Sequence, residues 1–368
     1  MKRRLLYITF ANKQVYTGGG KATACNQLAI KNCLGEKDVD IYIIEPVDEK
    51  HDLNFFVRRI SEIIKQYMGG LTKQHLNNIL KMLDTSVYTD LFIDNSLLGY
   101  VAKVARKRYP HLRIYTFFHN MEYDFISSLV WDNKDYLHSF LIPSAKYNER
   151  CACHYSDKII ALNNRDAARI KEIYNRNADM IIPIWIAKDN YVTSQNLPTE
   201  KGCKEALFVG SYFFGNTQGL KWFCTEVLPY VNIHLTIVGS GMEAFAEDIA
   251  LPENVSIHSN VPSLQSYYEQ ADFVVLPITT GGGMKVKTAE TLKYGKYIIG
   301  TSEALEGYEV NNEMATVCNT AKEFIDAIKG FNRSFKFNEP SRLLFKNKYC
   351  YSAVISRYAE ILDTPIPE

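Results

Sequence analysis

The stretch from Thr280 to Thr301 reads T-G-G-G-M-K-V-K-T-A-E-T-L-K-Y-G-K-Y-I-I-G-T. It predicts a glycine-rich loop, a helix over Met284–Tyr294 and a short apolar strand over Tyr297–Gly300. A helical spacing of about 100° per residue places Lys287 and Glu290 on one face of that helix, away from its apolar residues. A loop, helix and strand in this order are typical of proteins in which helices and strands alternate around a parallel sheet.

The start of this predicted helix suits an anionic ligand. The backbone amides of Gly281–Met284 and the positive end of the helix dipole attract phosphate. Lys285 and Lys287 fall in the predicted first turn, where cations oppose the dipole, and a bound diphosphate would remove that conflict. The alternative is a surface helix with lysine–glutamate pairs, each contributing about 0.2–0.5 kcal/mol. The residues of this stretch leave both interpretations open.

Strands and helices are predicted to alternate along the rest of the chain as well. In the first half the expected strands are Leu5–Thr9, Val39–Ile44, Leu91–Asp94, Arg113–Phe118, Lys158–Ala161 and Met180–Pro183. A second series is expected at Ala206–Val209, His234–Val238, Val255–His258, Phe273–Leu276 and Tyr297–Gly300. The pattern predicts an α/β fold with two Rossmann-like, doubly wound domains.

The chain has 368 residues, which exceeds the usual size of a single core. We expect an N-terminal Rossmann-like domain over 1–187 and a second one over 205–340. Residues 188–204 lose apolar periodicity and gather turn-forming residues, as linkers do. A C-terminal helical segment over 341–368 should dock on another part of the protein.

Composition limits the class of partner and the compartment. The formal net charge is +1, from 42 basic and 41 acidic residues, so nothing in the overall charge favours a nucleic-acid partner. The eight cysteines show no disulfide spacing. We therefore expect reduced thiols in a cytoplasmic protein. No apolar stretch approaches the ~20 residues of a membrane span.

Two further glycine motifs follow predicted strands. Gly18–Gly20 precede Lys21 and a predicted helix, but the spacing is not that of a P-loop. These glycines either approach a ligand or only build a flexible loop. Gly239-Ser-Gly241 superficially matches a dinucleotide fingerprint, yet the next predicted strand ends without the required acidic residue. We therefore interpret it as a structural turn and do not expect a nicotinamide enzyme.

Other polar residues are candidates for catalysis, metal binding or membrane contact. His119 follows a predicted strand, where it could transfer a proton or bind a ligand hydroxyl, or merely cap the strand. Asp38-Val-Asp40 and Cys151-Ala-Cys153-His154 lack the surroundings or spacing of metal sites, so we predict no metal. The basic segment Lys103–Arg113 is either a solvated helix end or a weak peripheral contact with the inner face of a membrane.

Several motifs in the second half occur in the order found in one enzyme family. They are L-F-V-G-S-Y from Leu207, Gly215-Asn216, Trp222-Phe223, Leu228-Pro229, I-V-G-S-G from Ile237, Y-Y-x-x-A-D from Tyr267 and G-G-M-K-V-K-T-A-E from Gly282. Across Ala206–Gly307 the chain resembles the donor-binding domain of GT-B glycosyltransferases. The resemblance is greatest to the family 4 group, whose members are retaining and depend on nucleotide sugars.

The resemblance implies a GT-B architecture, with two Rossmann-like domains facing across a cleft and a C-terminal helix crossing back to the first, acceptor-side domain. It implies hexosyl transfer from a nucleotide diphosphate sugar to a hydroxyl acceptor with retention and without a required cofactor. The expected acceptor is a glycan or lipid-linked intermediate of cell-surface polysaccharide synthesis. The alternatives are a nucleotide-sugar epimerase or hydrolase, or a non-catalytic nucleotide-sugar-binding scaffold.

The resemblance also assigns site residues. Glu290 matches a glutamate that typically binds the nucleotide ribose, and Lys285 or Lys287 would neutralise the diphosphate. An earlier glutamate of the family pattern is replaced here by Gly282, and the family's Arg/Lys pair is missing from 211–219. The predicted catalytic residues are His119, Lys287 and Glu290. The predicted donor-binding residues are Gly19, Gly20, Gly210, Gly281, Gly282, Gly283, Met284 and Lys285.

Overall fold

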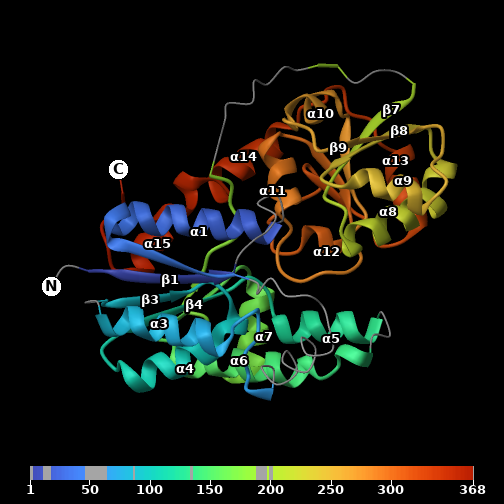
Figure 1. The fold of residues 1–368 in the computed structure, drawn as a ribbon. Coiled ribbons are helices and arrows are strands. Elements are labelled where there is room, and N and C mark those ends of the chain that lie inside the picture. The colour runs from blue at the N-terminus through green and yellow to red at the C-terminus, as the bar shows by residue number, and fades with distance from the viewer. Residues whose placement is uncertain are drawn as a thin grey trace. The chain divides into compact units, whose positions relative to one another are not determined.

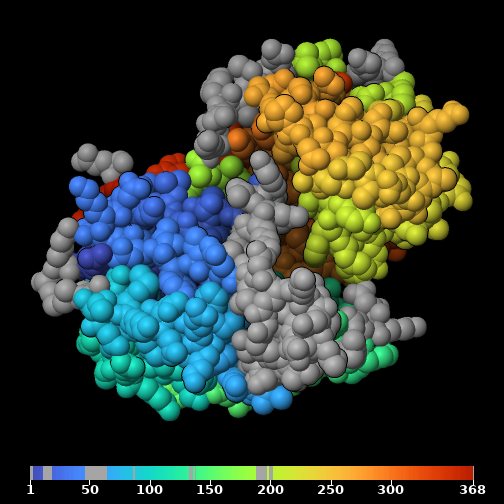
Figure 2. Space-filling model, in the orientation of Figure 1, coloured from blue at the N-terminus to red at the C-terminus, as the bar shows by residue number. Residues whose placement is uncertain are grey.

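The computed structural model describes residues 3–10, 18–45, 64–85, 88–132, 136–187, 197–198 and 202–367, which are coloured by residue number in Figures 1 and 2. The chain divides into two compact units. The first contains the described residues within 3–10, 22–183 and 355–367, and the second contains those within 18–21 and 184–354. The end of the chain therefore belongs to the first unit, as the resemblance implied for the C-terminal helix.

The first unit contains a six-stranded, fully parallel sheet in the order β2-β1-β3-β4-β5-β6. Its strands are β1 (Leu5–Phe10), β2 (Val39–Ile44), β3 (Asp90–Ile93), β4 (Arg113–Phe118), β5 (Lys158–Ala161) and β6 (Met180–Ile181). Its helices are α1 (Gly18–Leu34), α3 (Lys73–Thr85), α4 (Gly99–Arg108), α5 (Glu122–Asp132), α6 (Leu141–Tyr155), α7 (Asn164–Tyr174) and α15 (Tyr351–Ile361). The first turn of α1 and the first turn of α15 group with the second unit.

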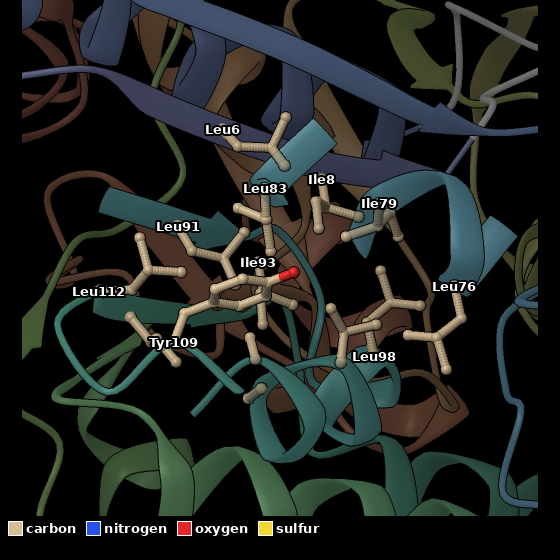
Figure 3. Close-up of a cluster of buried hydrophobic side chains, with 14 of the residues drawn as sticks. Leu6, Ile8, Leu76, Ile79, Leu83, Leu91, Ile93, Leu98, Tyr109 and Leu112 are labelled. Atoms are coloured by element: carbon tan, nitrogen blue, oxygen red, sulfur yellow. The ribbon is translucent and has the colours of Figure 1, made fainter. Parts of the chain in front are cut away.

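Helices cover both faces of this sheet, which explains why its strands are apolar almost throughout. In Figure 1, α1 and α15 lie on one side of β1, β3 and β4, and α3 and α4 lie on the other. On the α3 side, Leu76, Ile79 and Leu83 recur at helical spacing and pack against residues of β1 and β3 (Figure 3). This cluster anchors the strands whose ends carry the polar residues described below.

The second unit contains another six-stranded parallel sheet, in the order β12-β11-β10-β7-β8-β9. Its strands are β7 (Lys204–Val209), β8 (Ile233–Gly239), β9 (Val255–Ser259), β10 (Phe273–Leu276), β11 (Tyr297–Gly300) and β12 (Ala315–Val317). Its helices are α8 (Phe214–Glu226), α9 (Phe245–Asp248), α10 (Gln265–Gln270), α11 (Val286–Lys293), α12 (Ser302–Leu305), α13 (Ala321–Lys329) and α14 (Glu339–Lys348).

Each sheet has one point at which the strand order reverses. It lies between β1 and β3 in the first unit and between β7 and β10 in the second. Open α/β sheets bind ligands beyond the carboxyl ends of the strands at such a point. Residues after β3 and β1, and residues after β7 and β10, are therefore the first places to look for a site.

The structure corrects three local predictions. The segment predicted as one helix over 341–362 is two helices, because Tyr349 leaves helical geometry and its carbonyl accepts a hydrogen bond from the Ile186 backbone at 2.9 Å. The strand β12 was not predicted, since its three residues are too few to show a period. Gly18–Gly20 form the first turn of α1 instead of a loop, while Tyr16 and Thr17 lie outside the described residues.

Candidate active site

The loop after β10 has a backbone that depends on glycine. Gly281 has φ +145° and Gly283 has φ +59°, both in the region that side chains rarely adopt. Gly282 lies between them, and Met284 is buried. Glycine therefore occupies both positive-φ positions of this loop, which leaves its backbone uncovered by side chains there.

Lys285 fastens this loop to the neighbouring helix α12. Its Nζ donates to the Gly283 carbonyl at 2.8 Å and forms an ion pair with Glu303 at 2.7 Å. Its own carbonyl accepts a hydrogen bond from the Tyr308 hydroxyl at 2.7 Å. Lys285 is also the N-cap of α11 and lies outside the helix, whereas the sequence placed it in the first turn. Its ammonium is thus already paired with a carboxylate.

Helix α11 shows the two faces that the sequence predicted. Val286, Ala289 and Leu292 are buried, and the other face presents Lys287 and Glu290. This arrangement holds Lys287 and Glu290 one turn apart on a helix that is anchored by its apolar side.

Lys287 extends from α11 to the end of β7. Its Nζ donates to Asn216 Oδ1 of α8 and lies 4.6 Å from the centroid of the Phe208 ring. Burial and the positive charge of Lys285 together lower the pKa of Lys287 to about 7, although Glu290 opposes both effects. An anion beside this lysine would favour its charged form.

Glycines allow the ends of β7 and β8 to approach Lys287 closely. A Cβ on Gly210 would lie 3.0 Å from Lys287 Nζ, and a Cβ on Gly239 would lie 1.8 Å from the Gly210 carbonyl oxygen. Gly241 adopts φ +73°, which agrees with the structural turn interpreted from the sequence. Gly210, a predicted donor-binding residue, thus lies directly beside Lys287.

Glu290 is paired with a residue from the N-terminal glycine motif. Its carboxylate accepts a hydrogen bond from Lys21 Nζ, and only 13% of the Glu290 side chain is exposed. Gly19 and Gly20 belong to the same helical turn as Lys21. The structure therefore brings the two glycine-rich motifs together within the second unit through one ion pair.

His119 lies in the first unit, directly after β4. Its Nε2 is 3.1 Å from Asp94 Oδ1, and Asp94 is buried at the end of β3. Burial alone would lower the pKa of His119, but Asp94 and Glu122 raise it above its ordinary value. The histidine is therefore a partner in a charged pair at the point where the first sheet reverses order.

Asp94 is held by several groups besides His119. It accepts hydrogen bonds from the Thr23 hydroxyl at 2.6 Å, the Asn26 amide at 2.7 Å and the Thr9 hydroxyl at 3.2 Å. Burial alone would raise the pKa of Asp94, but His119, Thr23 and Asn26 hold it below its ordinary value. The Tyr358 hydroxyl of α15 donates to Asn26, which ties the end of the chain to this network.

Two more buried carboxyl groups lie near this network. Glu149 accepts hydrogen bonds from the Glu122 backbone at 2.7 Å and from the Tyr174 hydroxyl at 2.6 Å. Burial raises the pKa of Glu149 to about 8, against the Tyr174 hydrogen bond that opposes the rise, and burial also raises the pKa of Glu122. The Asn95 amide donates to Glu122 at 3.1 Å. These groups support the loop that carries His119.

The basic segment 103–113 is largely engaged within the protein. Arg106 is paired with Asp157, Arg108 with Asp84, and Arg113 with Asp90 and Asp363. These pairings favour the interpretation as a helix end over membrane contact. Among the described residues, no helix is long and apolar enough to cross a membrane.

The structure shows where the residues rejected as metal ligands lie. Asp40 accepts hydrogen bonds from Arg4 at 2.8 Å and from Tyr88 at 2.9 Å. Cys151 and Cys153 are buried in α6. All eight cysteines lie among the described residues, and none of them forms a disulfide.

Residues 203–331 match the family model described as Glycosyl transferases group 1. This segment of the chain is similar to that family. The match covers β7 to α13 and so includes Gly210, Lys287 and Glu290. The recognition made from the sequence motifs is confirmed at this level.

A curated relative matches a shorter portion. It is described as an uncharacterized 44.6 kDa protein in the cps region of Klebsiella pneumoniae, and it is 28% identical over 145 residues. The match covers 35% of this chain and 37% of that protein, so the chain spans little more than a third of the relative's length.

Solved structures of similar fold cover nearly the whole chain. A sucrose-phosphate synthase from Thermosynechococcus elongatus has a TM-score of 0.68 at 11% identity and covers 98% of both chains. The lipopolysaccharide outer core galactosyltransferase WaaB has a TM-score of 0.67 at 12% identity, covering 98% of this chain and 99% of its own. HepE of Anabaena, solved with UDP-glucose, has a TM-score of 0.65 at 11% identity, with coverage of 98% and 99%. The predicted GT-B fold is confirmed, and the residues that match the family model lie within its second unit.

The roles predicted for the site residues stay predictions, although the geometry brings several of them together. Lys287, Glu290 and Gly210 lie at the carboxyl ends of β7 and β10. No role was predicted for Asn216, Lys21 or Asp94. Asn216 belongs to one of the quoted motifs, so a role for it could have been predicted. Nothing in the sequence indicates that Lys21 pairs with Glu290.

Proposed function

We propose that this chain is a retaining glycosyltransferase that moves a sugar, of the hexosyl type, from a nucleotide diphosphate sugar to a hydroxyl acceptor. The acceptor is a glycan or a lipid-linked intermediate of cell-surface polysaccharide synthesis. The observation that carries the proposal is the position of Lys287 and Glu290 within the segment that matches the family model, at the point where the order of its sheet reverses. HepE of Anabaena, a protein of similar fold, binds UDP-glucose, and the Klebsiella relative comes from a cps region.

In this proposal the diphosphate binds beside Lys287 and the backbone of Gly281–Met284. As the bond to the sugar breaks, negative charge develops on the departing diphosphate, and a positioned ammonium stabilises it. Because an anion raises the pKa of a neighbouring lysine, donor binding itself would protonate Lys287. Lys285 supports the loop through Glu303 and the loop carbonyls.

Glu290 would bind the nucleotide ribose, since a carboxylate can accept hydrogen bonds from two hydroxyl groups. The ammonium of Lys21 pairs with Glu290 and orients that carboxylate. Gly19 and Gly20 belong to the same turn and would contact the donor through their backbone.

The first unit would bind the acceptor, with His119 contacting the acceptor or the donor sugar. Its pairing with Asp94 fixes the orientation of the ring and favours the protonated form. We place the enzyme in the cytoplasm, where the reduced cysteines and a nucleotide-sugar donor are both expected. No cofactor is assigned to the reaction.

A donor screen followed by a transfer assay tests this function. Nucleotide diphosphate sugars with uridine, adenosine and guanosine are compared by thermal shift, because a ligand at 100 times its dissociation constant stabilises the native state by about 2.7 kcal/mol. Transfer is then measured for wild type, Glu290→Ala and Lys287→Ala, with Glu172→Ala as an exposed control. We expect both site variants to lose donor binding and transfer, and the control to retain them.

Three outcomes would count against the proposal. Unchanged transfer in both site variants would refute the residue assignment. Release of free sugar without an acceptor product, across a range of glycan acceptors, would favour a hydrolase. Donor binding without any turnover would favour a non-catalytic scaffold.

A further inference from the structure

Asn216 makes two hydrogen bonds that together fix the direction of its side chain. Its Nδ2 donates to the Ser211 carbonyl at 2.7 Å, and its Oδ1 accepts from Lys287 Nζ. It is the third residue of α8, and its backbone N–H donates to the Phe213 carbonyl at 2.8 Å. Because the amide end is already used by Ser211, the carbonyl end must face the lysine.

The two lysines of the loop have partners of opposite kinds. Lys285 pairs with the carboxylate of Glu303, which neutralises its charge. Lys287 instead contacts a neutral amide oxygen and the face of the Phe208 ring. A neutral acceptor orients an ammonium without cancelling its charge, whereas a carboxylate would compete with a phosphate for it.

The hydrogen bond from Lys287 Nζ to Asn216 sets the position of the lysine side chain. Among the residues that the structure describes, the charged groups that act on it are Lys285 and Glu290 of its own segment, and Lys21 pairs with Glu290. From the β7 and α8 side it meets Phe208, Gly210 and Asn216, none of which titrates. Lys287 is a long side chain with several rotatable bonds, so an acceptor at its tip removes much of its freedom.

We propose that Asn216 is a positioning residue that aims the Nζ of Lys287 at the diphosphate of the donor without placing a negative charge beside it. This inference rests on the proposed function. It also accounts for the absence of the family's Arg/Lys pair from 211–219: in this chain the cation comes from α11, and the segment after β7 supplies its acceptor.

The test compares Asn216→Leu, which loses both hydrogen bonds, with Asn216→Asp, which keeps an acceptor for Lys287 and adds a charge. Thr217→Ala on the exposed side of the same helix is the control, since its hydroxyl only bonds carbonyls of its own turn. Binding of UDP, ADP and GDP and of the corresponding nucleosides is measured between pH 6 and 9, together with thermal unfolding of each variant.

We expect Asn216→Leu to bind the preferred nucleoside diphosphate about tenfold more weakly, as for a lost hydrogen bond to a charged group, and to bind the nucleoside as wild type does. The pH midpoint of diphosphate binding should fall in Asn216→Leu, because the ammonium loses an acceptor. It should rise in Asn216→Asp, because a carboxylate favours the charged lysine.

A purely structural role for Asn216 would leave this midpoint unchanged in both variants, even if their thermal stability fell, and that result would overturn the inference. If wild type and Asn216→Leu bound the diphosphate equally well, the inference would fail while the proposed function stood. If wild type bound none of the three diphosphates, both would fail.

Discussion

The two sheets reverse their strand order at points that carry opposite chemistry. In the first unit, the buried carboxylate of Asp94 is surrounded by groups of the chain itself, including His119 and Asn26. In the second unit, Lys287 has a neutral partner, and burial lowers its pKa to about 7. In the first unit, the charged groups at the reversal point pair with one another and stabilise the fold. In the second unit, Lys287 bonds a neutral amide, so an external anion would stabilise its charged form.

Removing the carboxylate of Asp94 should have the largest effect on stability. The substitution Asp94→Ala leaves the buried Asn26 and the part-buried His119 and Thr23 without their acceptor, which costs about 3–5 kcal/mol for a broken buried pair. The change in the free energy of unfolding is measured by urea unfolding, monitored through hydrogen exchange in peptides of the first unit. The exposed Glu172→Ala should change the free energy of unfolding by less than about 1 kcal/mol. An equal effect of both substitutions would contradict the closed network.

The substitution Gly239→Ala should have the next largest effect on stability, at the point where the sheet of the second unit reverses its strand order. The added Cβ of Gly239→Ala would lie 1.8 Å from the Gly210 carbonyl oxygen, so the ends of β7 and β8 must separate. Overpacking of this kind costs about 1–3 kcal/mol. Gly19→Ala is the matched control, since nothing lies within 4 Å of its added Cβ and alanine favours the helix by about 0.5–1 kcal/mol. Urea unfolding of both variants should give opposite signs, and a tolerated Gly239→Ala would argue against the close approach.

The two units should respond to pH in opposite directions. The pKa of His119 is raised above 6.5, so its contribution to stability is complete below pH 6.5 and is lost as pH rises through the folded-state value. The pKa of Lys287 is lowered to about 7 from 10.5, so the unfolded state binds more protons between these values and stability rises with pH across that window. One such group changes the slope by at most about 1.4 kcal/mol per pH unit.

Hydrogen exchange along a urea series, analysed separately for peptides of each unit, measures these slopes. His119→Gln should flatten the slope of the first unit and Lys287→Met that of the second. Lys296 is a necessary comparison, because burial also lowers its pKa to about 7. If Lys287→Met left the slope of the second unit unchanged while Lys296→Met removed it, the assignment to Lys287 would be wrong.

The smallest effect is expected at Glu149. Burial raises the pKa of its carboxyl to about 8, so the group is protonated at pH 7 and Glu149→Gln should change the free energy of unfolding by less than about 1 kcal/mol. Glu149→Ala should be clearly worse, because Tyr174 and the Glu122 backbone would lose their partner. The contribution of the wild-type carboxyl is present below its unfolded-state pKa and declines as pH rises towards 8. A Gln variant as damaged as the Ala variant would show that the ionised form matters.

The fold could be predicted from the sequence because its strands are apolar runs between turn residues. The bounds of β4 and β10 match the predicted ones, since both strands are buried on both faces and end at polar or turn-forming residues. The division of the Ser341–Leu362 segment into two helices could not be predicted, because it depends on the hydrogen bond between Tyr349 and Ile186, which are far apart in the chain.

The site could be predicted only in part, for the same physical reason. Helical spacing on α11 placed Lys287 and Glu290 on one face, and the structure has them there. Their partners depend on packing between distant segments: Asn216 lies 71 residues from Lys287, and Lys21 lies 269 residues from Glu290. Spacing along the sequence likewise gave Lys285 and Lys287 equivalent roles, whereas the position of Glu303 on α12 separates them.

Proton uptake on diphosphate binding tests the central claim most directly. Titration calorimetry of UDP, ADP and GDP at pH 8.5, in buffers of different ionisation enthalpy, counts the protons that accompany binding to wild type and to Lys287→Met. If Lys287 receives the diphosphate, wild type should take up roughly one proton with its preferred ligand, because a neutral lysine becomes charged beside the anion. The Lys287→Met variant should take up none and bind far more weakly. Binding to wild type without proton uptake, or equally tight binding to the variant, would contradict the account.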